Sequence, residues 1–323
     1  MGNKPVRLTD EEYEAVAAMR AARLKAHKNN TPNYQSGIAR AENIDSVPAE
    51  RGIVFGEDVQ SVEPLAGELR NDQITDLSLA NKIGVISDAH WPFHDLRREL
   101  DGSYSGAYLT AIEWLRNCGV DTLLLNGDMM DCYNLSSHEK VENNRSWKWE
   151  LDAARTMVKH LRDFFGDKVR IIYREGNHEE RLKRYLAQKA KELEGTIVLE
   201  EMLGLNEQGI EWVDERAKVK AGKLWIDHGH EWFGGGGVNP ARNYRMKAVD
   251  NVMVGHVHKT STDLFRRPLD GTFIAGWSVG CLCDLNPRYA PRNNWNHGVA
   301  LVELEAQGNF TVHNKVILQG VVR

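Results

Sequence analysis

Five short apolar runs in this chain each end abruptly at acidic, histidine or asparagine residues, and this recurrence constrains the fold more than any other sequence feature. The first run, IGVISDAH at residues 83–90, is rich in β-branched residues and predicts a β-strand. Residues two apart in an extended chain project to the same side. We therefore expect Asp88 and His90 to leave the strand end together, as one carboxylate and one imidazole.

The middle of the chain alternates between such runs and amphipathic stretches. Strands are predicted at residues 82–87, 122–126, 168–174, 223–227 and 251–254, and helices at 104–118, 149–165 and 179–194. This alternation indicates a layered α/β architecture, in which ligands gather beyond the strand ends. Strand-like segments at 264–279 and 299–318, with turns at 269–271 and 306–309, are expected to complete a second sheet.

The first 80 residues differ from the rest in pattern. Residues 9–30 predict a helix that begins with a capping box formed by Thr9 and Glu12. Residues 30–80 are acidic and weakly periodic, which favours a segment that wraps the main domain or remains mobile. We therefore predict a helical and acidic, partly irregular extension at 1–80, followed by one large domain at 81–323.

Charge and composition exclude some classes of protein. The net charge of −5 does not favour nucleic-acid binding by the whole surface, although a local basic channel remains open. No apolar stretch approaches the roughly 18 residues typical of a membrane span, so we expect a cytoplasmic protein without membrane contact. The four cysteines form no C-x-x-C pair and are expected to be reduced. Cys281 and Cys283 could reach a metal, but a half-buried strand explains their spacing equally well.

The residues that end the apolar runs form five motifs. They are Asp88-x-His90, Gly127-Asp128-x-x-Asp131, Gly176-Asn177-His178-Glu179, His228-Gly229-His230 and Gly255-His256-x-His258. This mixture of oxygen and nitrogen donors suits Mn²⁺, Fe²⁺, Zn²⁺ or Ni²⁺ better than a structural zinc held by thiolates. Seven good ligands are too many for one tetrahedral ion, whereas two ions that share a carboxylate would use them well. Each motif alone is commonly structural, but five in succession at strand ends favour a two-metal site.

The ordered series of motifs resembles that of the calcineurin-like metallophosphoesterase superfamily, over about residues 82–258. The resemblance implies a four-layer α/β/β/α sandwich of two mixed sheets flanked by helices, with the catalytic domain at 81–323. It implies one metal ion held by Asp88, His90, Asp128 and His258. The second ion would be held by Asp128, Asn177, His228 and His256, with Asp128 bridging the two.

The same resemblance assigns three further residues to catalysis. His178 matches the superfamily's histidine beside the substrate, where it would stabilise phosphoryl charge and protonate the leaving oxygen. Glu179 is expected to orient His178, and Asp131 is expected to fix a ligand or a bound water. The predicted reaction is phosphoester hydrolysis by a hydroxide that bridges two divalent ions, with Mn²⁺ favoured.

The second motif bears on the substrate. The serine/threonine protein phosphatases of this superfamily continue it as G-D-x-x-D-R-G, whereas here Cys132 and Tyr133 follow Asp131. The chain is more similar to the nuclease and phosphodiesterase branch, which includes phage-type members, so we favour phosphodiesters of nucleotides or nucleic acid. The alternatives are a phosphomonoesterase or protein phosphatase, a non-catalytic scaffold, and a nucleic-acid-binding protein that uses the N-terminal helix.

The glycine-rich stretch at residues 229–251 is the expected source of substrate contacts. Four glycines at 234–237 favour a mobile flap from which Arg242 or Arg245 would reach a phosphate, and a flexible surface connection is the alternative. His230 competes with His228 as a metal ligand, and we prefer His228 because it directly follows the apolar run LWID. Trp91 could stack on a nucleobase, although core packing explains it equally well.

Overall fold

A computed structural model describes residues 73–100, 103–137, 146–234 and 236–323 of the chain. Its strands form a seven-stranded sheet, a six-stranded sheet and a short hairpin. The larger sheet contains, in spatial order, β15 (Val321–Val322), β14 (Phe310–Leu318), β13 (Gly298–Leu304), β2 (Lys82–Ile86), β5 (Thr122–Asn126), β6 (Arg170–Arg174) and β7 (Ile210–Val213). The smaller sheet contains β1 (Ile74–Asp76), β8 (Lys218–Ala221), β9 (Leu224–Asp227), β10 (Val252–Val254), β12 (Phe273–Ser278) and β11 (Ser261–Arg266). The hairpin pairs β3 (Arg97–Arg98) with β4 (Tyr104–Ser105).

The described helices connect these strands. The α-helices are α2 (Ala107–Asn117), α3 (Trp147–Phe165), α4 (Glu180–Lys189), α5 (Leu199–Leu203) and α6 (Pro240–Ala248). Single 3₁₀ turns form η1 (Tyr133–Leu135), η2 (Lys191–Leu193), η3 (Asn206–Gln208) and η4 (Ala306–Gly308). None of the described helices is both long and apolar enough to cross a membrane.

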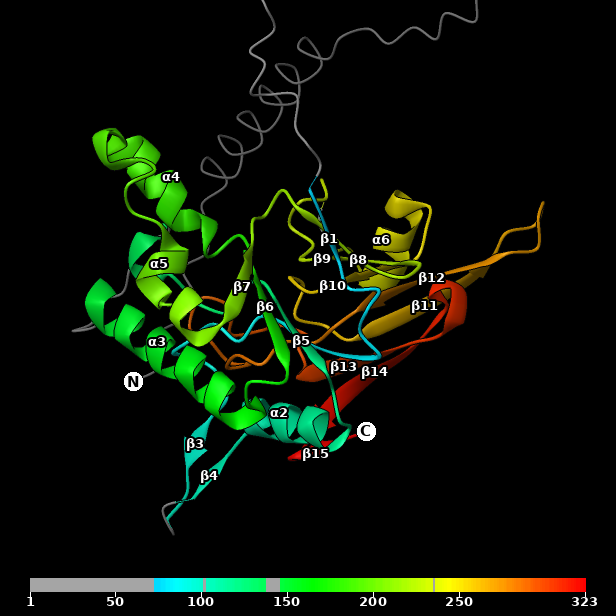
Figure 1. The fold of residues 1–323 in the computed structure, drawn as a ribbon, viewed down its shortest axis with the longest axis horizontal. Helices are drawn as coiled ribbons and strands as arrows, with labels where there is room; N and C mark the ends of the chain where they lie inside the picture. The colour runs from blue at the N-terminus through cyan, green and yellow to red at the C-terminus, as the bar shows by residue number, and fades with distance from the viewer. Residues whose placement is uncertain (1–72, 101–102, 138–145, 235) are drawn as a thin grey trace, which may run out of the picture. The chain divides into compact units, whose positions relative to one another are not determined.

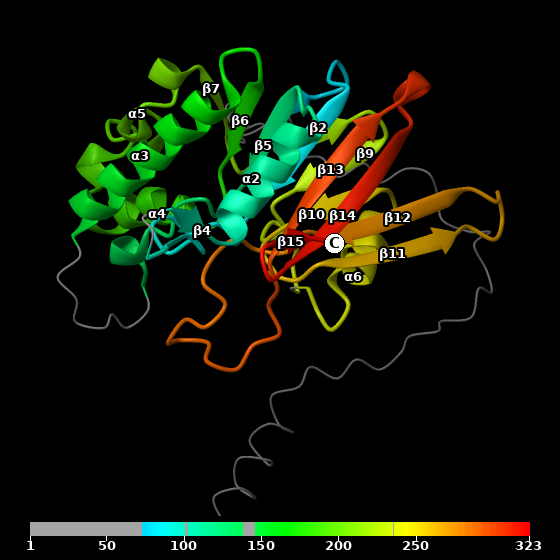
Figure 2. The ribbon, with the colours of Figure 1, turned by 90° about the horizontal axis from the view of Figure 1, so that it is seen from below.

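Buried side chains on successive strand positions separate the molecule into layers. In β5, Leu123 and Leu125 pack against the helices on one face, whereas Leu124 packs between the two sheets. This alternation follows from the two-residue period of a strand, and a strand buried on both faces needs apolar residues throughout. Tyr244 of α6 packs on the outer face of the smaller sheet. Figures 1 and 2 show α2 and α3 beside the larger sheet and α6 beside the smaller one. The predicted α/β/β/α sandwich of two mixed sheets is therefore confirmed.

The strands after residue 258 do not form one additional sheet, as the sequence had suggested. β11 and β12 pair with each other and extend the smaller sheet through β10. β13 and β14 instead join the larger sheet, where β13 pairs antiparallel with β2. Each hairpin completes a different sheet because its apolar positions fit a different gap between layers.

The predicted extension at 1–80 lies mostly outside the described residues, including the expected helix at 9–30. Its final residues contribute β1, which pairs in parallel with β8. The boundary at 80/81 therefore stays a prediction, while the smaller sheet includes residues that precede it.

Parallel strands bring the five motifs to one place. β2, β5 and β6 are parallel neighbours in the larger sheet, and β9 and β10 are parallel neighbours in the smaller sheet. Each of these strands is followed directly by one motif, so their carboxyl ends deliver the motifs to the same edge of the sandwich. This is the edge at which open α/β sheets bind ligands.

Candidate metal centre

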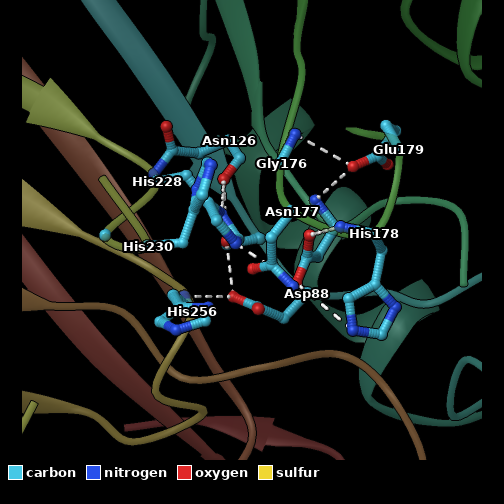
Figure 3. Close-up of polar contacts among 12 residues, drawn as sticks. Asp88, Asn126, Gly176, Asn177, His178, Glu179, His228, His230 and His256 are labelled. Carbon is cyan, nitrogen blue, oxygen red and sulfur yellow. Dashed lines mark hydrogen bonds and ion pairs between the residues drawn. The ribbon is translucent and has the colours of Figure 1, made fainter. Parts of the chain in front are cut away.

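The predicted ligands converge from both sheets. His90 Nε2 lies 3.2 Å from His258 Nε2, which lies 3.1 Å from Asp88 Oδ1. His228 Nε2 lies 3.2 Å from Asp128 Oδ2, and the side chains of Asp128, His228 and His256 form a compact group able to hold a cation. Figure 3 shows His228, His230 and His256 on one side of the cluster and His178 on the other, with Asp88 and Asn177 between them.

Five of the seven candidate ligands have a left-handed backbone conformation. These residues are Asp88, His90, Asp128, His256 and His258, with φ between 52° and 63°. Residues other than glycine seldom adopt positive φ, and each such residue is held there by its surroundings at some energetic cost. Strain of this kind at successive strand ends is typical of a functional site, because it turns each side chain inward from its strand.

Two glycines allow the ligand loops to approach each other closely. A Cβ atom at Gly176 would lie 2.3 Å from Asp128 Oδ1, and one at Gly255 would lie 2.0 Å from Ser87 Oγ. Both distances are far shorter than a van der Waals contact. The glycines in the Gly-Asn-His-Glu and Gly-His-x-His motifs are therefore required by packing beside the carboxylates.

Hydrogen bonds fix the orientation of the histidine ligands. His90 Nδ1 lies 2.7 Å from Asp131 Oδ1, and His228 Nδ1 lies 2.7 Å from the Asn126 carbonyl oxygen. In each case the bond at Nδ1 leaves Nε2 directed into the cluster, as a metal-binding imidazole requires. Asp131 therefore lies against the His90 ring, and its role in fixing a ligand stays a prediction.

Two supports of the ligands were not predicted. Cys283 Sγ lies 3.7 Å from His258 Nδ1, and it forms a compact group with the side chains of His90 and His258. Glu231 accepts hydrogen bonds from the backbone N–H groups of His228 and Gly229 and is paired with the buried Arg174. The acidic residue directly after the His-Gly-His motif was the available signal for Glu231, whereas the spacing of Cys281 and Cys283 left a metal role and a half-buried strand equally open for Cys283.

The electrostatics of the cluster favour ionised carboxylates. Burial opposes ionisation of Asp88, yet the neighbouring His258 holds the pKa of that carboxyl well below its usual range. Burial likewise opposes ionisation of Asp131, but hydrogen bonds from His178 and His90 lower its pKa. Burial lowers the pKa of His256 to about 4, which leaves a neutral imidazole with a lone pair for a cation.

The donor atoms fit the two cations that the resemblance implies. Asp88 Oδ1, Asn177 Oδ1 and His228 Nε2 are buried and have no well-aligned hydrogen-bond partner within the described residues. Buried polar atoms without a hydrogen bond are costly unless a further group satisfies them. The atoms are carboxylate, amide and imidazole donors, which divalent first-row metals accept.

His178 lies beside Asp128 and contacts Arg181. Its Nδ1 lies 2.8 Å from the Asp131 carbonyl oxygen, and the Arg181 guanidinium lies 2.9 Å from its Nε2. This pair of contacts corresponds to a neutral ring that donates from Nδ1 and accepts at Nε2. Burial also lowers the pKa of His178. The positive charge at this position therefore belongs to Arg181, to which the sequence analysis assigned no role.

Glu179 does not orient the His178 ring, as the sequence had suggested. Its buried carboxylate accepts hydrogen bonds from the backbone N–H groups of Asp128, Met130 and Gly176 and from the hydroxyl of Tyr173. The Glu179 side chain instead joins the loop after β5 to the loop after β6. It acts on the ligands by holding their backbone.

The four predicted substrate-binding residues have different positions. His230 lies beside the cluster, with its ring 5.4 Å from that of His228. Trp91 is completely buried in the main core, so its ring is not available for stacking on a substrate. Arg245 is also buried, paired with Asp263 and packed over the Phe265 ring, which corrects its assignment to a phosphate. Arg242 is exposed on α6 and remains a candidate.

Part of the expected glycine-rich flap is a helix. α6 begins at Pro240, and the Asn239 side chain accepts a hydrogen bond from the backbone N–H of Arg242. An asparagine N-cap followed by proline at the first helical position is a recognised helix start, which the run of glycines had obscured.

A family of known proteins matches most of this region of the chain. Comparison with curated protein sequences gives no match. Among solved structures, a single mutant of Vps29 from Entamoeba histolytica is 15% identical and has a TM-score of 0.38, covering 75% of this chain and 96% of its own. A dimetal phosphatase from Danio rerio is 11% identical and has a TM-score of 0.35, covering 72% of this chain and 95% of its own. The family described as calcineurin-like phosphoesterase matches residues 81–260, more than half of the chain and all five motifs. The chain therefore belongs to the calcineurin-like phosphoesterase family.

Proposed function

We propose that this protein is a hydrolase that uses two divalent metal ions to cleave phosphoesters, with a preference for phosphodiesters of nucleotides or nucleic acid. The observation that carries the proposal is the position of Asp128. Its carboxylate belongs to a group with His90 and His178 and also to a group with His228 and His256. One carboxylate shared by two sets of ligands is the arrangement that a two-metal hydrolase needs.

The ligands divide into two sets around Asp128. One ion would be held by Asp88, His90, Asp128 and His258, and the other by Asp128, Asn177, His228 and His256. Bound ions of this kind supply Lewis-acid stabilisation of phosphoryl charge and lower the pKa of water. We favour Mn²⁺ because the donors are a mixture of carboxylate, amide and imidazole groups.

The chain's own residues complete the proposed chemistry. Asp131 holds the rings of His90 and His178 through their Nδ1 atoms. We assign Arg181 to the phosphoryl oxygens, because its guanidinium already lies against His178 Nε2 and charge-assisted hydrogen bonds suit phosphate. When Arg181 turns to the substrate, His178 Nε2 becomes available for proton transfer to or from the ester oxygens.

The second motif supports a diester. At the position where the protein phosphatases have arginine, this chain has Cys132, which is buried and has its pKa raised by burial and by nearby carboxylates. The position therefore provides no cation for the two charges of a phosphomonoester. A diester carries one negative charge and has less need of such a cation.

The test is hydrolysis of bis-p-nitrophenyl phosphate and p-nitrophenyl phosphate by protein loaded with Mn²⁺. We expect faster turnover of the diester. Asp128→Ala should lose both bound metal and activity, whereas His178→Ala should retain metal and lose at least about 100-fold in kcat, as expected for a general acid or base. His160→Ala, which removes an exposed histidine of α3, is the matched control and should behave as wild type.

Two outcomes would contradict the proposal. Inactivity of the metal-loaded wild type on both esters and on nucleotides would indicate a non-catalytic scaffold. Two-metal stoichiometry in Asp128→Ala, measured by elemental analysis, would exclude the bridging role of this carboxylate.

A further inference from the structure

The segment that joins β12 to β13 places two aromatic rings beside the ligand cluster. We call residues 284–297 the aromatic segment. The Trp295 ring lies 4.2 Å from the imidazole of His258, and Tyr289 lies 6.2 Å from Trp295, measured between ring centroids. Figure 2 shows this segment in orange, extending well beyond the ends of β12 and β13.

The base of the aromatic segment is attached to the backbone at His258 and Thr260. Asn296 donates from its backbone N–H to the carbonyl oxygen of His258, over 2.9 Å. Its side-chain oxygen accepts from the backbone N–H of Thr260, also over 2.9 Å. The position of Trp295 is therefore coupled directly to that of a candidate metal ligand.

A second asparagine braces the rest of the segment. The Asn293 amide donates to the carbonyl oxygens of Leu285 and Ala290, both over 2.8 Å, and its oxygen accepts from the backbone N–H of Trp295. These three bonds close the segment on itself between Leu285 and Trp295. The rings are thus presented by an internally bonded loop, and less conformational entropy is lost when a ligand binds.

The two rings are available to a ligand. Tyr289 is 71% exposed, and Trp295 is partly exposed although it contacts His258. Partial burial and the nearby charge of Asp131 raise the pKa of Tyr289.

Arginines lie on the aromatic segment and near it. Arg288 and Arg292 are exposed on the aromatic segment, and Arg181 contributes to the electrostatic surroundings of Tyr289. The chain as a whole carries a net charge of −5. Aromatic rings interleaved with arginines bind single nucleotides or single strands, because bases stack on the rings while phosphates pair with the arginines.

We propose that Tyr289 and Trp295 form a nucleobase subsite next to the scissile phosphate, so that the enzyme prefers esters in which the phosphate carries a nucleoside. This inference rests on the proposed function and adds the residues that select the substrate. The subsite recognises the flat face of a base, and stacking of this kind is tolerant of base identity because every base has a π-face. Arg181 and the two arginines of the segment contact the phosphates on either side.

Two esters with the same leaving group test the proposal. They are thymidine 5′-(p-nitrophenyl phosphate) and ethyl p-nitrophenyl phosphate, both diesters of one negative charge that release p-nitrophenolate when water adds to phosphorus. With Mn²⁺-loaded wild type, we expect kcat/KM to be at least about tenfold higher for the thymidine ester, through a lower KM, as stacking of one base would give. Trp295→Ala should reduce this ratio to near one, and Trp295→Phe should retain most of it.

The controls separate this proposal from the one on which it rests. Phe273→Ala removes an exposed ring at the far end of β12 and should leave the ratio unchanged. Tyr289→Ala, on the exposed part of the segment, should lower the ratio even if Trp295→Ala does not fold. If wild type hydrolyses both esters with equal kcat/KM, or if Trp295→Ala and Tyr289→Ala keep the preference, the nucleobase subsite is wrong. If wild type hydrolyses neither ester, the proposed phosphodiesterase function itself fails.

Discussion

Asp131 contacts both His90, a candidate metal ligand, and His178, the proposed proton-transfer residue. One of its oxygens lies 2.7 Å from His90 Nδ1 and 3.1 Å from His178 Nδ1. That oxygen accepts from both rings, and its negative charge strengthens both contacts relative to the neutral amide oxygen of asparagine. The single charge of Asp131 therefore orients a metal ligand and the proposed proton-transfer residue together.

We expect Asp131→Asn to lower kcat and metal affinity by about 10- to 100-fold each, as loss of a supporting carboxylate commonly does. At saturating Mn²⁺ the variant should still bind two ions, because no ligand has been removed. Metal titration followed by assay would measure both effects. Asp163→Asn, an exposed carboxylate of α3, is the control, and wild-type kcat with wild-type metal affinity in Asp131→Asn would refute the supporting role.

Among single residues, the sequence predicted those whose side-chain type alone indicates metal binding. Asp88, His90 and Asp128 were found from their residue types at the ends of apolar runs, and the structure brings them together. Arg181 and Cys283 could not be assigned, because their contacts depend on how a helix and a distant loop pack against the histidines. Trp91 was misleading because a tryptophan beside a ligand is equally suited to the core.

α3 is attached to the ligand loop after β5 by one buried carboxylate in its first turn. Glu150 accepts a hydrogen bond of 2.8 Å from the backbone N–H of Tyr133 and one of 3.1 Å from the Asn134 side chain. Burial raises the pKa of Glu150 to about 7, although the bonds from Tyr133 and Asn134 oppose the shift. The packing of α3 thus depends on a titratable group, Glu150, that contacts the residues following Asp131 in the chain.

The sign of the resulting pH dependence follows from proton binding. Between the ordinary pKa of 4.5 and about 7, the folded protein holds a proton on Glu150 that the unfolded chain has lost. The stabilisation from this group is complete below the lower value and is lost as pH rises through the upper one. A difference of this size corresponds to about 3 kcal/mol in the free energy of unfolding.

We therefore expect the difference in unfolding free energy between wild type and Glu150→Gln to shift between pH 5 and pH 8, with wild type losing more stability as pH rises. Urea unfolding at several pH values within this range would measure it. Glu113→Gln, which alters an exposed carboxylate of α2, should follow wild type at every pH. Parallel pH profiles for wild type and Glu150→Gln would show that Glu150 does not titrate in this range.

Elements with strong periodicity were predicted well. The expected strand at 122–126 coincides with β5, and the expected helix at 149–165 differs from α3 by two residues at its start. α6 was missed because four glycines precede it and its apolar face is short. β13 was expected in the second sheet but pairs with β2 in the larger one. This pairing depends on packing between layers, which the local sequence does not indicate.

The two sheets together bury the carboxylates of Asp88 and Asp128 at one edge. Each charge raises the cost of ionising the other, and both side chains are almost completely inaccessible to water. Such an arrangement stabilises the folded protein only when a cation or a protonated neighbour balances it. The whole molecule is thus expected to gain stability from bound metal, independently of catalysis.

A ligand that binds only the folded state stabilises it by RT ln(1 + [L]/Kd), or about 2.7 kcal/mol at 100 times Kd. For a domain of this size, we expect Mn²⁺ added to chelator-treated protein to raise Tm by about 5 to 10 °C. Asp128→Asn retains the side-chain shape but removes the shared charge, so its Tm should be higher than wild type without metal and should rise less when metal is added. Thermal scans over a range of Mn²⁺ concentrations measure both effects, with Asp163→Asn as the control. An equal rise in Asp128→Asn and wild type would mean that the two ions do not meet at Asp128.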